Sequence, residues 1–371
     1  MSIEEFRTNK ILLKYFFKLP NMFPLYKNDG KPLISLSSIQ IENIGIVKSK
    51  ISKGIYVLTE NKCLCWNQNI SNDIIISEKD RYWFSIEQIL CSKCWLIRSW
   101  KIFDGKSNQE FYEKEYRSIY VWSHQAPQDF FEDQISRWKL LLNTFETIVW
   151  KKQKSVVFEI GCWAGGVLFP WKSNWFTCAG CDFDENYLNF WTKKGLTLNY
   201  WDYDKIVDDN SIDIIILSHV MEHFLNPIKE IQRIIKKIRI WGYLIVEVPG
   251  IFYINKMYFD PILFFQNAHV FNYYYSYLKI FFEKLWLEVI YGDEKCTFIL
   301  KKPDNYIEKQ ISEIYYESLS IYPIKILKYL QYCKKYMYFN PFYLAHKILT
   351  PLWLYKIVGN IYFKTTKFLW K

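Results

Sequence analysis

Glycine is scarce in this sequence, and tryptophan is abundant. The chain of 371 residues contains 13 glycines and 16 tryptophans, so its glycine share is about half of the usual ~7%. Half of the residues are apolar and 23% are charged, which excludes a disordered chain and indicates a globular protein. The net charge of +10 favours an anionic ligand or an anionic surface.

Other features are also missing from the chain. Acidic residues precede any apolar run at the N-terminus, which argues against a secretory signal. The longest uncharged stretch, residues 261–278, contains several polar side chains and is a poor membrane span. Nine cysteines, an odd number, indicate reduced thiols or metal ligands rather than disulfides. Neither heptads nor internal repeats are present. We therefore expect a cytoplasmic protein.

From residue 155 onward, short apolar runs alternate with helical patterns. The predicted strands are 156–160, 176–181, 196–200, 212–217, 243–248, 285–291 and 297–300, and the predicted helices include 185–194 and 226–238. The last two strands have no room for a crossover helix between them, so they should pair antiparallel. This order predicts an α/β fold with a doubly wound, mostly parallel sheet that ends in an antiparallel hairpin.

The rest of the chain divides around this central domain. We predict an N-terminal extension (1–60), a small module with two cysteine pairs (61–104), a helical lead-in (105–150), the α/β domain (151–302) and a basic, aromatic, helical tail (303–371). From Ser318 onward the tail has nine lysines and no acidic residue. It is expected either to cap the domain or to make peripheral contact with an anionic membrane surface, which would place the protein at the inner membrane surface.

A cluster of small residues follows the first strand of the α/β domain. Such a turn exposes backbone N–H groups at a helix start, where a nucleotide-like cofactor can approach the main chain. Asp182 and Asp202 end the next two strands, so their carboxylates should face the same crevice and could accept hydrogen bonds from ribose and adenine. Both acids could instead be turn or helix caps. A dinucleotide oxidoreductase is the rival interpretation, but Glu159 inside the strand and the terminal hairpin argue against it.

The segment 155–302 resembles the S-adenosylmethionine-dependent methyltransferases with a Rossmann-like fold, and is most similar to bacterial enzymes that tailor sugars, polysaccharides and secondary metabolites. The stretches that carry the resemblance are Val156–Gly166, Gly180–Asp184, Asp213–His223, Gly242–Gly250 and Gln266–His269. The resemblance implies S-adenosylmethionine as the cofactor. The expected cofactor-binding residues are Glu159, Gly161, Cys162, Trp163, Gly165, Gly166, Asp182, Asp202, Ser218 and His219.

Three of the five histidines fall near the same crevice. His223 follows the fourth strand and is the preferred general base, with Glu222 and His269 assisting it. The alternative is that His219 and Glu222 only cap the following helix. Methyl transfer from a sulfonium can also proceed by proximity and orientation without a dedicated base.

Upstream, the resemblance extends to a zinc-ribbon-like module. Two close cysteine pairs can supply the four thiolates of a tetrahedral zinc ion, and the expected ligands are Cys63, Cys65, Cys91 and Cys94. The first pair has one residue between its cysteines, where the family has two, so a degenerate module that folds without metal is the alternative. Cys178 and Cys181 lie along a predicted strand and are expected in the core.

Tryptophan stands where the family has glycine. The positions are Trp66, Trp95, Trp163, Trp241 and Trp286, and Trp138, Trp175, Trp191 and Trp201 fit the same rule. Ordinary drift would replace glycine by a small residue. We therefore hypothesise that the gene reads the codon UGA as glycine and that this sequence renders UGA as tryptophan. If the tryptophans are genuine, Trp163 would project into the path of the cofactor, and a non-catalytic scaffold becomes the leading alternative.

The expected function is S-adenosylmethionine-dependent methyl transfer to a small-molecule or glycan acceptor that is anionic, such as a sugar nucleotide or a surface polysaccharide intermediate. A nucleic-acid methyltransferase would need a basic groove and is not favoured. The sequence leaves open whether oxygen, nitrogen or carbon is methylated, and it leaves the oligomeric state open.

Overall fold

The structure is a computed structural model. It describes residues 24–32, 36–67, 70–120, 128–149, 154–163, 165–184, 188, 196–200, 202–308, 311, 314, 322–341 and 343–344. The predicted helix 185–194 and most of the tail lie outside these residues.

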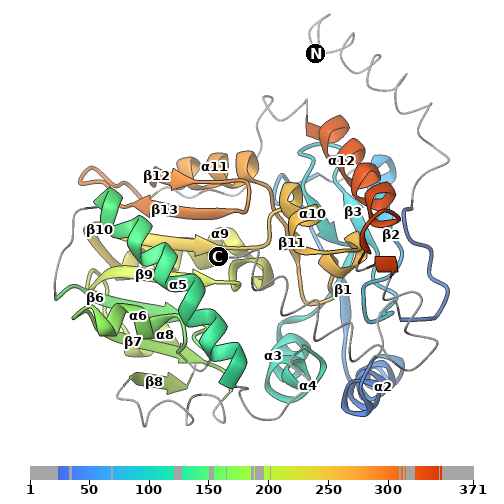
Figure 1. Ribbon diagram of the computed structural model, residues 1–371, viewed down its shortest axis with the longest axis horizontal. Helices are drawn as coiled ribbons and strands as arrows, with labels where there is room; N and C mark the ends of the chain where they lie inside the picture. The colour runs from blue at the N-terminus through green and yellow to red at the C-terminus, as the bar shows by residue number, and fades with distance from the viewer. Residues whose placement is uncertain are drawn as a thin grey trace, which may run out of the picture.

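A seven-stranded sheet forms the core of one half of the molecule, on the left in Figure 1. In spatial order its strands are β12 (Glu288–Gly292), β13 (Thr297–Lys301), β10 (Ile238–Glu247), β9 (Ile212–Ser218), β6 (Val156–Ile160), β7 (Thr177–Asp182) and β8 (Thr197–Tyr200). The pairs from β10 to β8 are parallel, whereas β13 is antiparallel to both β10 and β12. The predicted parallel sheet with a terminal hairpin is therefore confirmed.

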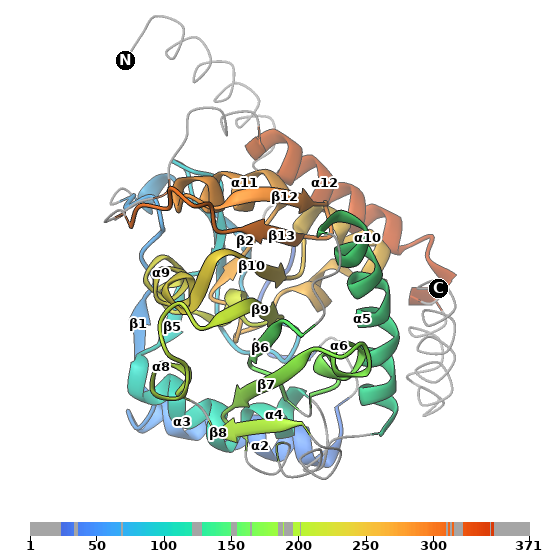
Figure 2. The same cartoon turned by 90° about the vertical axis from the view of Figure 1, so that its left-hand side faces the viewer.

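Helices cover both faces of this sheet (Figure 2). The helices α5 (Gln128–Val149) and α6 (Leu168–Ser173) lie on one side, and α8 (Tyr203–Ile206) and α9 (Pro227–Lys237) lie on the other. Neighbouring residues in one strand face opposite sides, as the pleat requires. Ile214 and Ile216 pack with the α5 side, whereas Ile215 and Leu217 pack with α9. The unbroken apolar run from Ile214 to Leu217 follows from burial on both faces.

The cysteine-bearing region forms a second, four-stranded sheet. Its strand order is β11 (Phe271–Asn272), β4 (Ile97–Ser99), β3 (Gln88–Leu90) and β2 (Ile74–Ser77). Since β11 belongs to the α/β segment and pairs antiparallel with β4, the two regions share one sheet. A two-stranded sheet of β1 (Leu58–Glu60) and β5 (Lys101–Phe103) adjoins it.

Shorter elements complete the architecture. The lead-in comprises α3 (Gly105–Lys114), α4 (Tyr116–Tyr120) and α5, and α2 (Ser38–Ser52) packs against α4. Between β9 and β12 lie η3 (Met221–His223), η4 (Ile251–Tyr253), α10 (Ile254–Met257), η5 (Pro261–Phe264) and α11 (Tyr275–Lys284), and η2 (Ile70–Asn72) precedes β2. Within the tail lies the helix α12 (Tyr322–Met337), which packs against η4, α10 and η5. Among the described residues, none of the helices combines the length and apolarity needed to cross a bilayer.

Candidate active site at the carboxyl edge of the sheet

The cofactor loop begins where β6 ends. Gly161 and Gly165 adopt positive φ angles of 72° and 76°, which side chains disfavour. A Cβ atom at Gly161 would lie 2.5 Å from Val220 Cγ2, and one at Gly165 would lie 2.7 Å from Leu196 Cδ1. A Cβ at Gly166 would lie 2.4 Å from Gln134 Oε1. These three glycines therefore allow a tight turn between packed elements, as the sequence predicts.

Glu159 lies inside β6 directly below this loop. Its side chain is buried, and Oε2 has no hydrogen-bond partner in the part of the chain that the structure describes. Burial, and secondarily the charge of Asp182, raise the pKa of Glu159 well above its usual range. A buried polar atom without a partner is costly. Glu159 thus fits the role of a ligand acceptor whose hydrogen bond forms when a cofactor enters.

Asp182 ends β7 and receives hydrogen bonds from three directions. Its carboxylate accepts from the backbone N–H of Trp163 (2.9 Å), from Arg117 Nη2 (2.8 Å) and from the backbone N–H of Asp184 (3.1 Å). The guanidinium of Arg117 also stacks 3.7 Å from the centre of the Trp163 indole. The predicted ribose acceptor therefore lies at the loop, but an ion pair and an indole share its surroundings.

The other predicted cofactor residues lie along the same edge. Asp202 follows β8, and its carboxylate bonds Lys205 Nζ at 2.7 Å. Ser218 ends β9 and donates to Glu247 at 3.5 Å, while the N–H of Cys162 donates to the carbonyl of Cys181. These acids and polar groups therefore lie along the carboxyl edge of the sheet, as expected. Their contacts with a cofactor stay predictions.

The catalytic residues predicted from sequence come together. Ligand atoms of Glu222, His223 and His269 all lie within 4.8 Å of one another, and His219 Nδ1 lies 3.4 Å from Glu222 Oε1. Both carboxylate oxygens of Glu222 are buried without a hydrogen-bond partner among the described residues. The cluster has the donor types and the spacing that could hold a divalent cation, as well as those needed to bind an acceptor.

The tautomer of His223 follows from one contact. Its Nδ1 lies 2.9 Å from the carbonyl oxygen of Ala268, which can only accept, so Nδ1 carries the proton and Nε2 keeps its lone pair. Burial lowers the pKa of His223, against the opposing charge of Glu222. Burial and the neighbouring His223 lower the pKa of His269 well below its usual range. Both imidazoles are therefore neutral at pH 7, as a general base must be.

Residues of the lead-in enclose this cluster, and sequence reasoning did not identify them as site residues. The rings of Tyr112 and Tyr116 meet His223 edge to face, with centroids 5.8 and 5.9 Å away. Tyr120 donates to the side chain of Asn267. The only signal for them was the tyrosine-rich stretch of residues 111–120, and nothing in the sequence identified Arg117.

The four predicted metal ligands also converge. Cys63 Sγ lies 3.3 Å from Cys94 Sγ, Cys65 Sγ lies 3.6 Å from Cys91 Sγ, and all four sulfurs lie within 4.8 Å of one another. A tetrahedral zinc ion with Zn–S bonds of about 2.3 Å holds its sulfurs about 3.8 Å apart. The short first pair therefore does not prevent a four-sulfur arrangement. Cys178 and Cys181 are buried along β7, as expected.

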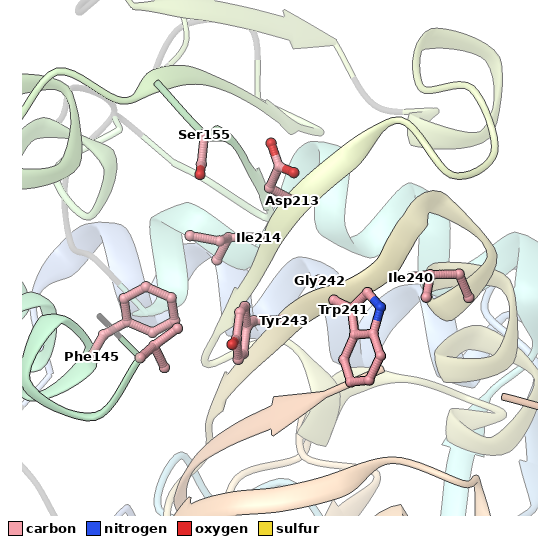
Figure 3. Close-up of a pocket in the computed structure, with 9 residues that line it drawn as sticks. Phe145, Ser155, Asp213, Ile214, Ile240, Trp241, Gly242 and Tyr243 are labelled. Atoms are coloured by element: carbon pink, nitrogen blue, oxygen red, sulfur yellow. The ribbon is translucent and has the colours of Figure 1, made fainter. Parts of the chain in front are cut away.

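A pocket at the opposite, amino edge of the sheet is remote from these groups. It is lined by Phe145, Ser155, Asp213, Trp241 and their neighbours (Figure 3). No predicted catalytic or cofactor residue contributes to it. Its lining offers one carboxylate, which is already paired with Arg239, so we assign it no part in the chemistry.

Comparison with known proteins is consistent with this geometry. Residues 130–290 match a family model described as a methyltransferase domain. The search of curated proteins found no match. The similar solved structures include a phosphoethanolamine N-methyltransferase from Haemonchus contortus, 13% identical, which aligns over 60% of this chain and 55% of its own with a TM-score of 0.41. An S-adenosylmethionine-dependent methyltransferase from Archaeoglobus fulgidus is 18% identical over 55% of this chain and 93% of its own, with a TM-score of 0.36.

The family match covers the cofactor loop, Asp182 and the cluster around His223 in one continuous stretch. The sheet order and the orphaned carboxylate of Glu159 at the loop agree with it. Residues 130–290 form a methyltransferase domain, and the protein is an enzyme of the S-adenosylmethionine-dependent class.

Proposed function

We propose that the enzyme transfers a methyl group to a hydroxyl of an anionic sugar nucleotide or glycan intermediate. The observation that carries the proposal is the cluster of Glu222, His223 and His269 beside the cofactor loop, with the Nε2 lone pair of His223 unprotonated. S-adenosylmethionine supplies the methyl group. As the acceptor oxygen takes the methyl group, its proton would pass to the lone pair of His223 Nε2.

Positive charge near this cluster supports an anionic acceptor. Arg81 is held by the carbonyl of Leu263 through Nη1, and its buried Nε has no hydrogen-bond partner among the described residues. Its charge contributes to the lowered pKa of His269. An acceptor phosphate or carboxylate would satisfy this orphaned donor. The resemblance to sugar-tailoring enzymes agrees with such an acceptor.

On the cofactor side, the proposed ligands are Glu159, the loop glycines, Asp182 and Asp202. The backbone N–H of residue 163 holds Asp182 whatever its side chain, but the indole of Trp163 stacks on Arg117 at the same place. The side chain of Trp163 is therefore a feature of the loop that opposes cofactor binding.

Calorimetric titration tests the proposal. S-adenosylhomocysteine is titrated into the protein with Trp163→Gly and into the protein with Trp163. Binding by the glycine form, followed by methylation of at least one member of a nucleotide-sugar panel, is the expected result. Absence of binding to both forms rejects the proposed cofactor site, and binding without turnover of any panel member rejects this class of acceptor.

A further inference from the structure

We infer that seven positions printed as tryptophan are glycine in the protein that its own cell makes, and that residue 163 of the cofactor loop is one of them. These positions are Trp66, Trp83, Trp95, Trp163, Trp175, Trp241 and Trp286. The inference is independent of the proposed acceptor. It rests on backbone conformation, helix ends and burial.

Backbone conformation singles out these seven residues. Each has a φ angle between 49° and 69°, a left-handed conformation that is an outlier for a bulky side chain. Twelve non-glycine residues of the described chain have positive φ, and tryptophan supplies seven of them. Three of the other five are Asp202, Asn210 and His219, which are types that tolerate this region. Chance placement would not concentrate the least suitable side chain there.

Two helix ends show what these positions require. After α6, the N–H of Trp175 donates to the carbonyl of Lys172 and the N–H of Phe176 donates to the carbonyl of Trp171. This pair of bonds defines a Schellman motif, in which the left-handed residue is usually glycine. In this motif Trp175 occupies the glycine position, with φ 69°.

The end of α11 repeats the arrangement. There the N–H of Trp286 donates to Glu283 and the N–H of Leu287 donates to Phe282. At the end of α2 the same two bonds run from Gly54 to Ile51 and from Ile55 to Lys50. Gly54 has a φ of 70°. One chain thus builds the same motif three times, once with glycine and twice with tryptophan.

Burial distinguishes Trp138 and Trp171 from these seven residues. None of the seven is buried, and Trp175 exposes 79% of its surface, whereas Trp138 and Trp171 are buried to 1% and 0% exposure. Those two lie within α5 and α6 and do not have positive φ. Trp100 does not have positive φ either. We therefore assign Trp138 as a genuine core tryptophan, which corrects its inclusion among the glycine positions, and Trp83 is added to them. Trp191 and Trp201 lie outside the described residues.

The assignment changes the cofactor loop. With glycine at 163, the loop becomes glycine at positions 161, 163, 165 and 166, and the indole stacked on Arg117 disappears. The bond from the N–H of residue 163 to Asp182 is made by the backbone and persists. At the far edge of the sheet, the indole of Trp241 is likewise removed from the pocket wall (Figure 3). A single cause, a UGA codon read as glycine, accounts for all seven positions.

The decisive measurement is the peptide mass of the protein purified from its own cells. We expect glycine at the seven positions and tryptophan at 138 and 171, which serve as internal controls. Tryptophan at the seven would overturn the inference, and so would glycine at 138 and 171, since the backbone distinction would then have no meaning.

A second measurement uses recombinant protein. The chain carrying Trp→Gly at all seven positions should unfold at a higher temperature than the printed chain, while Trp138→Gly with Trp171→Gly should unfold at a lower one. A lower unfolding temperature for the sevenfold variant contradicts the inference. Neither measurement depends on cofactor binding. If the protein with glycine at 163 failed to bind S-adenosylhomocysteine, that result would reject the proposed function and leave the assignment of the seven glycines unchanged.

Discussion

At the scale of single residues, His223 owes its free Nε2 lone pair to one backbone contact and its neutral form to burial. The carbonyl of Ala268 fixes the proton on Nδ1, and the rings of Tyr112 and Tyr116 enclose the imidazole. Because the pKa of His223 is lowered, its imidazole stays neutral even at a pH somewhat below 6.5, the approximate ordinary pKa of histidine. The fold thus prefers the neutral form, and His223 contributes stability above its unfolded pKa that is lost as the pH falls through its folded pKa.

A pH profile follows from this lowered pKa. With an acceptor found in the nucleotide-sugar panel, kcat/KM should stay level near neutrality and fall only as the pH drops below about 6.5. His223→Gln should remove that acidic limb and reduce kcat by roughly 100-fold to 10,000-fold. The affinity for S-adenosylhomocysteine, measured by calorimetry, should not change. An unaltered rate in the variant would mean that proximity alone drives the transfer.

The pKa of Glu159 is shifted in the direction opposite to that of His223, so its effect on stability has the opposite pH dependence. Its folded pKa is raised, so its protonated form is favoured, and the associated stability is present below the unfolded pKa and lost as the pH rises. Glu159→Gln removes the need to bury a charge. At pH 7 the ligand-free variant should therefore be more stable than the parent protein.

Chemical denaturation and calorimetry check this prediction together. The gain in unfolding free energy should shrink as the pH falls toward about 4, because the carboxyl of the unfolded chain then also becomes protonated. S-adenosylhomocysteine should bind the variant more weakly, because an amide cannot ionise to form the stronger hydrogen bond that a carboxylate accepts. A variant less stable at pH 7 would show that Glu159 is ionised and already paired in the empty site.

At the scale of elements, the end of α6 offers a matched pair of substitutions four residues apart. Trp175→Gly places glycine at a left-handed position and removes an exposed indole, so it should stabilise the protein by about 1–2 kcal/mol. Trp171→Gly empties a buried site beside Phe145 and Phe176 and should cost more than about 3 kcal/mol. Thermal unfolding of the two variants checks the difference. Equal effects would mean that the left-handed conformation carries no penalty.

Elements of the central sheet could be predicted because their signals are local. The strand 156–160 and the hairpin near residues 288–301 agree with the predicted segments, since apolar runs bounded by turn residues leave little choice of position. β10 begins at Ile238, five residues before the prediction. The added length contains Trp241 at positive φ and a register shift before Tyr243. An irregular strand of this kind has no clean period of two, so the sequence did not reveal it.

Contacts between elements that are distant in the chain could not be predicted from a single sequence. Arg117 pairs with Asp182 across 65 positions, and β11 leaves the α/β segment to join the cysteine-bearing sheet. Both depend on tertiary packing and not on local propensity. The cysteines were an exception, because two close pairs of thiols are a local pattern with one common geometric use.

At the scale of the whole molecule, the cysteine cluster is connected to the candidate active site. β4 pairs with β11, and Ser99 at the end of β4 donates to the carbonyl of His269 at 2.8 Å. Cys94 lies in the turn that joins β3 to β4. A change at the cluster should therefore be felt at His269, although the two groups share no ligand.

We expect the purified protein to hold one zinc ion per chain at Cys63, Cys65, Cys91 and Cys94. Cys94→Ser should abolish that stoichiometry, lower the unfolding temperature by several degrees and reduce methyl transfer, because the turn that positions β4 loses its cross-link. Cys178→Ser is the matched control, since this buried thiol lies in β7 outside the cluster. It should keep the metal and most of the activity.

Elemental analysis and thermal unfolding, with and without a chelator, separate the remaining outcomes. If the chelator removes zinc and destabilises the parent protein to the level of Cys94→Ser, the ion holds the four-stranded sheet together and, through Ser99, the backbone of His269. If the parent protein contains no metal, and Cys94→Ser and Cys178→Ser cost the same stability, the four thiols are a packed core. The module would then be a degenerate one that keeps the geometry of a zinc site through burial alone.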